Sequence, residues 1–316
     1  AVGKDALESN TTASGNTAVG KDSLTANTTG SNNTAVGKIA LCSNTTGTCN
    51  VAIGVDSLDS NTTGGSNIGI GTDSLQSNTT GNSNVAIGDD AMKTNSTASN
   101  NTAIGTASLC TNTTGDFNVS MGAYSLDANT TGVDNTAIGS YTLSANSTGV
   151  RNVAVGYASG FNNTTANDNT SVGACSLYSN TTGTSNVAVG NNALKTQTTA
   201  DGNTAIGSDT LCTITSGAGG NTAVGQKSLE DDTTGFYNTA VGSLSLCQNT
   251  TGSCNVAIGR EALRNNTTAS ENIAVGSKSL CANTTGTANT ALGVEALHAN
   301  TTANSNTAVG LKSLYA

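Results

Sequence analysis

Residues 20–36 read GKDSLTANTTGSNNTAV, and close copies of this segment fill the chain. A glycine recurs at every seventeenth residue from Gly3 to Gly207, the step lengthens once to eighteen at Gly225, and the shorter step then continues to Gly310. A fixed period this short means that each repeat is one structural unit, which buries its apolar residues only against its neighbours. The sequence therefore predicts a stacked array of similar units.

The length of the repeat selects its architecture. Two-helix repeats need more than about thirty residues and leucine-rich repeats at least about twenty, so a seventeen-residue unit fits neither. Before each glycine the unit carries a β-branched, a small and an aliphatic residue, as in Val51–Ile53, and Asn, Gly, Ser and Thr enclose this segment. Such a segment is typical of a short strand between tight turns. We predict an all-β fold, a parallel β-solenoid or β-roll of about eighteen seventeen-residue coils.

We expect residues 1–316 to form a single repeat array, with a register slip of one residue near residues 212–221. The chain begins and ends inside a repeat and has no atypical coil at either end, whereas isolated solenoids protect their open edges with such coils. This favours a fragment of a longer fibre, or end-to-end stacking of chains.

Two columns of large apolar residues are expected to share the interior of the solenoid, the leucine of each unit and the aliphatic residue before each glycine. The residue two before each glycine is always small, usually alanine. It is expected either at a contact between chains or inside an unusually thin coil. The first members of the two large columns are Leu24, Leu41, Leu58, Leu75, Val19, Val36, Ile53 and Ile70.

An asparagine lies four residues before each repeat glycine without exception. A row of ligand-binding groups would give this pattern, but a hydrogen-bonded ladder of side-chain amides along the stack explains it better, because a buried stacking device tolerates no substitution. The predicted ladder begins with Asn16, Asn33, Asn50, Asn67 and Asn84.

The segments Asn84–Gly88 and Asn255–Gly259, both NVAIG, resemble the strands of trimeric autotransporter adhesin heads. The whole unit is similar to repeats of phage tail-fibre and bacterial surface-fibre proteins. The resemblance to adhesin heads implies a parallel β-roll assembled as a homotrimer. This chain has seventeen residues per coil where the adhesin heads have fourteen, and the additional residues lie in the NTTG turn.

The NTTG turn contains N-x-[S/T] acceptor sequences for N-glycosylation, which would form a row of sugars along one edge that faces solvent. The alternative is turn chemistry alone, since Asn tolerates left-handed backbone and Thr hydroxyls bond locally. Gln197, Ile214 and Asp232 replace the asparagine while the hydroxyl pair after it persists, so the pair serves either a ladder or O-linked sugar. The candidate glycosylation sites are Asn10, Asn27, Asn44, Asn61, Asn78, Asn95, Asn112, Asn129, Asn146, Asn163, Asn180, Asn249, Asn266, Asn283 and Asn300.

Two cysteine pairs flank this turn with identical spacing, Cys42 with Cys49 and Cys247 with Cys254. A loop closed within one coil is a reasonable geometry for a disulfide, so we predict both bonds and an oxidising, extracellular location. The other cysteines have no partner in their own coil, and we expect free thiols, small buried residues or links between chains at Cys110, Cys175, Cys212 and Cys281.

No feature of the sequence predicts catalysis, and we expect no enzyme, no cofactor and no metal site. His298 is the only histidine, and no C-x-x-C pair accompanies it. A net charge of −9 disfavours nucleic acid as a partner. No run of eighteen apolar residues is present, so we expect no membrane span in this segment.

These observations favour a structural segment of an extracellular fibre or surface filament, located outside the cell or on a cell or virion surface. Whether glycans cover it, or bind to it, stays open at this point. The expected partner is the chain itself, in a homotrimer or an end-to-end filament. The alternative is a binding solenoid, either an adhesin that grips a surface or carbohydrate, or an ice-binding protein.

Overall fold

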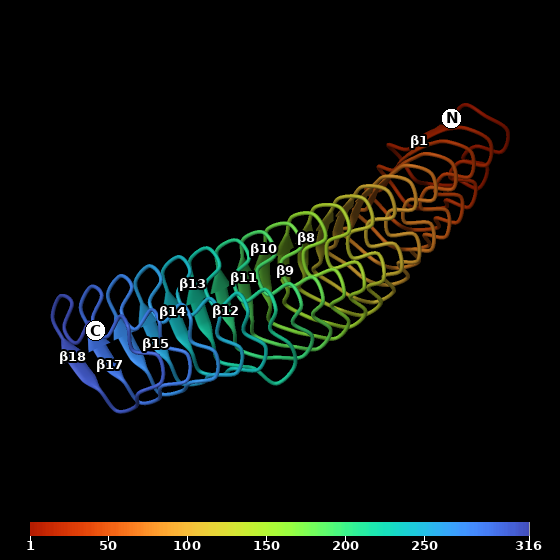
Figure 1. Cartoon of the computed structure of the whole chain (residues 1–316). Coiled ribbons are helices and arrows are strands. Elements are labelled where there is room, and N and C mark those ends of the chain that lie inside the picture. Colours follow the sequence, from red (N-terminus) through yellow and green to blue (C-terminus); the bar gives the residue numbers. More distant parts are fainter. Residues whose placement is uncertain (316) are drawn as a thin grey trace. The chain divides into compact units, whose positions relative to one another are not determined.

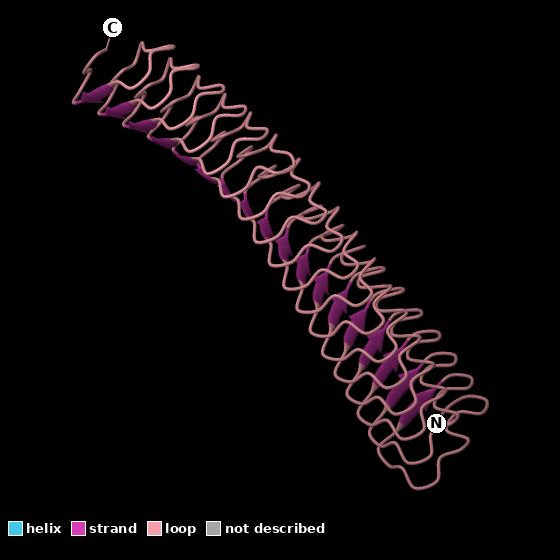
Figure 2. Cartoon of the chain, turned by 90° about the horizontal axis from the view of Figure 1, so that it is seen from below, coloured by secondary structure: helices cyan, strands magenta, loops and turns pink. Residues whose placement is uncertain are grey.

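The structure, a computed structural model, describes residues 1–315, and all of its regular structure is β. Each coil contributes one strand of three residues, and turns and loops complete the coil (Figure 2). Every recorded strand pairing is parallel, between strands of successive coils. The predicted parallel β-solenoid of seventeen-residue coils is confirmed.

The chain divides into two compact units, which we describe separately. The first unit is Ala1–Asn152, and its strands pair in chain order from the first to the last. These strands are β1 (Thr17–Val19), β2 (Thr34–Val36), β3 (Val51–Ile53), β4 (Ile68–Ile70), β5 (Val85–Ile87), β6 (Thr102–Ile104), β7 (Val119–Met121) and β8 (Thr136–Ile138).

The second unit begins at Val153, and Figure 1 shows its strands side by side in chain order. Its strands are β9 (Val153–Val155), β10 (Thr170–Val172), β11 (Val187–Val189), β12 (Thr204–Ile206), β13 (Thr222–Val224), β14 (Thr239–Val241), β15 (Val256–Ile258), β16 (Ile273–Val275), β17 (Thr290–Leu292) and β18 (Thr307–Val309).

The strand register is the same before and after the eighteen-residue step, since Thr204 of β12 pairs with Thr222 of β13. The additional residue lies in the loop before Ala218. Asn203 Nδ2 donates to the carbonyl of Ala218, fifteen residues later. In a regular coil, Asn33 Nδ2 donates to the equivalent carbonyl of Gly47, fourteen residues later. Gly217 is exposed and has a φ of +85°, so the loop absorbs the insertion without disturbing the strands.

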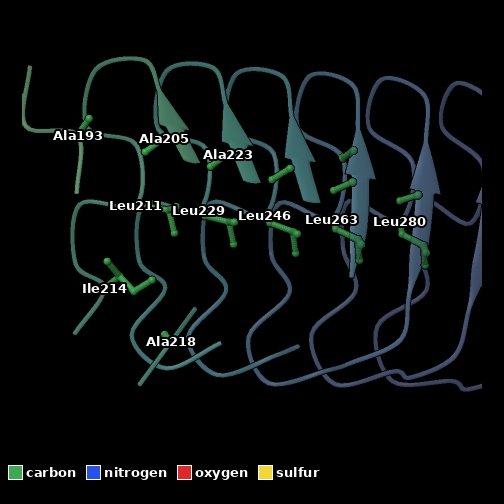
Figure 3. Packing of buried hydrophobic residues seen from close by; sticks show 14 of the residues in the cluster. Ala193, Ala205, Leu211, Ile214, Ala218, Ala223, Leu229, Leu246, Leu263 and Leu280 are labelled. Carbon is green, nitrogen blue, oxygen red and sulfur yellow. The ribbon is translucent and has the colours of Figure 1, made fainter. Parts of the chain in front are cut away.

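The interior contains the leucine and alanine columns. Leu24, Leu41, Leu58 and Leu75 are fully buried, as predicted, and Figure 3 shows the leucines of the second unit in one row from Leu211 to Leu280. We call the central residue of each strand, alanine in most coils, the Ala column. Its members are at most 3% exposed, so the second of the two alternatives holds and the small residues lie inside a thin coil.

The aliphatic residue before each glycine does not join this interior, and the prediction for this column was wrong. Alternate residues of a strand point to opposite faces, so a buried Ala column forces both of its neighbours outward. The four members named above, which are Val19, Val36, Ile53 and Ile70, are therefore exposed or half-buried.

The coil is thin because the strand packs directly on a column of serine, alanine and, in two coils, threonine from the following turn. A Cβ atom built on Gly69 of β4 would lie only 2.7 Å from the Ser57 hydroxyl and 3.1 Å from that of Ser74. Ser57 also donates to the Gly69 carbonyl at 3.0 Å. No space for a large side chain exists between these two walls, which explains why this strand position is always small.

The repeat glycine is required by both conformation and contact. Gly88 has a φ of +137°, and a Cβ atom there would lie 2.6 Å from both the carbonyl carbon and the oxygen of Gly105 in the next coil. Residues other than glycine do not adopt this backbone conformation without strain. The period of seventeen therefore marks a place where successive backbones come too close for any side chain.

Candidate functional site

The outer strand face consists of the first and last residue of every strand, which point away from the Ala column. The first residue is Thr, Val or Ile, and the last is always aliphatic or, once, methionine. Ile53 and Ile206 are each 40% exposed, and Ile87 is 36% exposed. Each coil thus places a large apolar side chain on the same surface of its unit.

The outer strand face of each unit is as large as the largest apolar patch of a typical monomer. A strand of three residues spans about 10 Å and adds about 4.8 Å to the stack, which gives roughly 380 Å² for the strands of the first unit and roughly 480 Å² for those of the second. The largest apolar patch on a typical monomer measures about 300–600 Å². Each partner in a standard protein interface buries about 800 Å², roughly twice the face of either unit.

The asparagines of the NTTG turns form a second, buried column, which we call the turn-Asn column. The prediction that this edge faces solvent was wrong for nearly all of them. Asn10 is exposed and Asn300 is half-buried, in the first and last of these turns. The remaining candidate glycosylation sites are at most 2% exposed: Asn27, Asn44, Asn61, Asn78, Asn95, Asn112, Asn129, Asn146, Asn163, Asn180, Asn249, Asn266 and Asn283.

The physical reason for this burial is the hydrogen bonding of the amide nitrogen. Asn61 Nδ2 donates to Asn44 Oδ1 at 2.9 Å and to the Gly64 carbonyl at 3.0 Å. An N-linked sugar attaches to this same nitrogen and would need open space around it. In the folded coil the nitrogen instead closes the turn and joins it to the preceding coil.

The first threonine of the turn forms a further ladder outside the turn-Asn column. The hydroxyl of Thr45 donates to the Thr62 carbonyl of the next coil at 3.1 Å, and the hydroxyl of Thr62 donates to the Thr79 carbonyl at 3.0 Å. The second threonine of the pair, such as Thr63, is exposed. The first hydroxyl of the pair therefore has a role in stacking that does not depend on the sequon.

The asparagines that precede the strands form the strand-Asn column. Asn33 Oδ1 accepts from the backbone N–H of Asn50 at 2.9 Å, and Asn50 Nδ2 donates to the Gly64 carbonyl at 2.8 Å. That carbonyl also accepts from Asn61, so both of its lone pairs are used. The same donors and acceptors connect the successive members of this column, Asn16, Asn33, Asn50, Asn67 and Asn84.

Asn61→Ala is expected to destabilise the coils around it by roughly 2–4 kcal/mol, because the Asn44 oxygen would be left buried without a donor. Hydrogen exchange of the amides between residues 44 and 78 would measure this, since an array of repeats opens locally. Thr63→Ala, on the exposed side of the same turn, is the control and should change little. Equal protection in the two variants would contradict the role of the turn-Asn column.

The turn-Asn column is interrupted in the second unit. Gln197 donates to the Ala200 carbonyl at 2.8 Å, and the side chain of Ile214, fully buried at the next step, has no group that can hydrogen-bond. On one side of the break, Asn180 Oδ1 is buried without a partner. On the other side, Asp232 Oδ2 is buried without a partner.

Asp232 occupies the place of an asparagine. Its Oδ1 accepts from the Gly235 N–H at 3.1 Å and from Asn249 Nδ2 at 2.9 Å. Burial raises the pKa of this carboxyl to about 7, although those two hydrogen bonds act in the opposite direction. A neutral carboxylic acid carries an O–H group where asparagine carries its NH₂, so the protonated form is the one that suits this column.

All eight cysteines are free thiols, so the two predicted disulfides are absent. In the first pair, Cys49 is exposed, whereas the Cys42 sulfur lies 3.7 Å from the Asp59 carbonyl of the next coil. The turn between them is closed by the Asn44 side chain, which donates to the Gly47 carbonyl at 3.0 Å. A disulfide is not needed to hold this loop.

The second cysteine pair is also separate. Cys254 is exposed, whereas Cys247 is buried with its sulfur 3.7 Å from Glu230 Oε2. Burial, followed by the nearby carboxylate of Glu230, raises the pKa of the Cys247 thiol to about 11. This thiol is therefore protonated at neutral pH, a state that reacts poorly. The four cysteines for which no disulfide was predicted are half-buried: Cys110, Cys175, Cys212 and Cys281.

The remaining groups named in the sequence analysis are dispersed. His298 stacks against Tyr315, with ring centroids 5.1 Å apart. Within residues 1–315, no three His, Cys, Asp or Glu side chains gather closely enough to hold a metal ion. The same residues form no helix that is long and apolar enough to cross a membrane.

No protein-family model matches this chain, and no curated protein matches it. A function for this chain therefore has to be inferred from its repeat and its solenoid fold.

Proposed function

We propose that this chain is a structural segment of an extracellular filament on a cell or virion surface, built from copies of the solenoid that associate through the outer strand face. The observation that carries the proposal is the large apolar residue that every strand exposes on this face. Its burial between copies would remove this apolar surface from water, which favours association.

The interior of each coil is complete without this face. The Ala column, the leucines and the two asparagine columns already fill the coil. The asparagine amides also find their hydrogen-bond partners within the chain. The outward Val and Ile residues thus contribute little to the fold of a single chain. A solvated face would accept polar residues at these positions, as antiparallel sheets with one wet side do.

Three copies are the assembly that we propose, as in the trimeric adhesin heads that the NVAIG segments resemble. In such an arrangement each chain turns one narrow strip of short strands toward the other two. The strands are only three residues wide, which fits a contact along a common axis. Stacking of chains end to end would lengthen the filament.

The combined substitution Ile53→Lys and Ile87→Lys is expected to weaken self-association at least tenfold, because each charge would lose its hydration in the interface. Analytical ultracentrifugation of the chain measures the change. Thr63→Lys with Thr97→Lys adds the same charge on exposed turns of the same coils and is the control. A wild-type chain that remains monomeric at high concentration would contradict the proposal, as would equal association of the two variants.

Ice binding by the same face is the second candidate function. The observation in its favour is the regular grid of methyl and hydroxyl groups that Thr, Val and Ile place on strands about 4.8 Å apart. This candidate predicts a monomer with thermal hysteresis that the Ile53→Lys and Ile87→Lys substitutions abolish. A self-associating chain without thermal hysteresis would exclude it.

A further inference from the structure

The insertion in the second unit creates a cleft on the surface of the solenoid. The cleft has a volume of about 370 Å³, and its lining includes Asp201, Gly217, Gly219, Gly220, Phe236 and Tyr237. This volume lies in the range of about 300–1,000 Å³ that small-molecule sites occupy. The inserted loop creates the cleft because three of the lining residues are its glycines, which carry no side chain.

The apolar wall of the cleft consists of two adjacent aromatic side chains. Phe236 and Tyr237 are 44% and 68% exposed, and their rings meet edge to face with centroids 5.5 Å apart. The Tyr237 ring lies over Gly220, since a Cβ atom on that glycine would come within 2.6 Å of the ring. The glycine therefore seats the tyrosine and fixes the orientation of its ring.

The polar wall contains two backbone N–H donors and the residue Asp201, whose side chain is held by the preceding coil. Asp201 Oδ1 accepts from the backbone N–H of Thr184 at 2.6 Å and from its hydroxyl at 3.0 Å, which holds the carboxylate in place. The backbone N–H groups of Asp201 and Gly219 donate no hydrogen bond to any residue from 1 to 315. In another coil, the equivalent N–H of Ser99 donates to Asp116 Oδ1 of the next coil at 2.7 Å.

The missing acceptors follow directly from the sequence of this region. The residue that would accept from the Asp201 N–H is Gly219, which has no side chain, and the residue that would accept from the Gly219 N–H is Phe236, which is apolar. Two backbone N–H groups without an acceptor and two aromatic rings therefore belong to residues that line one cleft. No lysine or arginine is among the lining residues.

We propose that this cleft binds a neutral carbohydrate of one or two sugar units. The apolar C–H face of a sugar ring would pack on Tyr237, and its hydroxyl oxygens would accept from the N–H groups of Asp201 and Gly219. An anion would meet the carboxylate with no cation to compensate it. A quaternary ammonium ion would suit the rings and the carboxylate, but it has no acceptor for the two N–H groups.

The test uses the full chain on an array of neutral oligosaccharides, followed by calorimetric titration of the best mono- or disaccharide found. Tyr237→Ala is expected to weaken that binding at least tenfold. Phe117→Ala is the matched control, because Phe117 is also exposed and lies at the equivalent place of a regular coil, next to Asp116. This control should leave the affinity unchanged.

A second variant tests the cleft without removing an aromatic ring. Gly217→Asn is expected to abolish binding by filling the cleft, since no atom lies within 4 Å of a Cβ atom at this glycine and asparagine tolerates left-handed backbone. An array without any neutral sugar bound would overturn the proposal. So would binding that survives both variants, or binding of choline in place of sugars. These results are independent of self-association through the outer strand face.

Discussion

Asp232→Asn is expected to stabilise the surrounding coils by about 4 kcal/mol at pH 8 and above, and to change their stability little near pH 4. The pKa of this buried carboxyl is raised from 3.8 to about 7 in the folded chain, chiefly by desolvation. The folded state therefore binds the proton more tightly than the unfolded state does. The stability contributed by the neutral acid is complete below pH 3.8 and is lost as pH rises through 7.

Asparagine removes this dependence of stability on pH, because its side-chain NH₂ group is a hydrogen-bond donor at every pH. Its Nδ2 would take the place of Asp232 Oδ2 and could donate to the Gly235 carbonyl, as Asn249 Nδ2 donates to the Gly252 carbonyl at 2.9 Å. Hydrogen exchange of residues 225–249 between pH 5 and pH 9 measures the effect, after correction for the intrinsic exchange rate. Asp134→Asn, at an exposed turn position, is the control. Identical pH profiles for the two variants would show that Asp232 is not the group responsible.

Gly88→Ala is expected to open its coil and the next one, with a loss of roughly 3–5 kcal/mol. The alanine would have to adopt a φ of +137°. Its Cβ atom would lie 2.6 Å from the backbone of Gly105, which cannot move without breaking its own contacts. Local hydrogen exchange and the thermal midpoint both report this loss.

Gly202→Ala separates the strain of a positive φ from the backbone clash. Gly202 has a φ of +68°, and no atom lies within 4 Å of a Cβ atom there, so this change should cost only about 1–2 kcal/mol. Losses of similar size in the two variants would mean that the close approach of Gly88 to Gly105 is not what keeps this position glycine.

The period, the parallel strands and the inward leucines could be predicted from the sequence, because a repeated spacing reports directly on a repeated structure. The orientation of the strand could not be predicted by hydrophobicity. Thr-Ala-Val suggests valine inside, yet Ala18 is buried and Val19 is 40% exposed. The signal that identifies the inner face is size, since the central residue is small in every coil and the aliphatic residue varies freely among Val, Ile, Leu and Met.

The burial of the NTTG turn could not be predicted from its composition either. Asparagine and threonine are typical of exposed turns, and here they fill the interior because each amide in a stack meets an identical amide in the next coil. The sequence did contain one contrary sign. Ile214 replaces the turn asparagine, and an isoleucine that is 0% exposed marks that place as interior. The cleft could not be predicted, because it arises where the glycines of the inserted loop meet an aromatic pair of the next coil.

The uniform register of the coils has a consequence for how such a chain changes over generations. Every coil offers its neighbours the same amide donors, carbonyl acceptors and strand edge, so removal of residues 71–87 would join Ile70 to Gly88 and leave each remaining contact with an equivalent partner. Unequal recombination between copies of the coding repeat can therefore lengthen or shorten the protein by whole coils without any compensating mutation. A gain of a single residue is accommodated only in a loop, as at Gly217, and there it altered the surface without altering the stack.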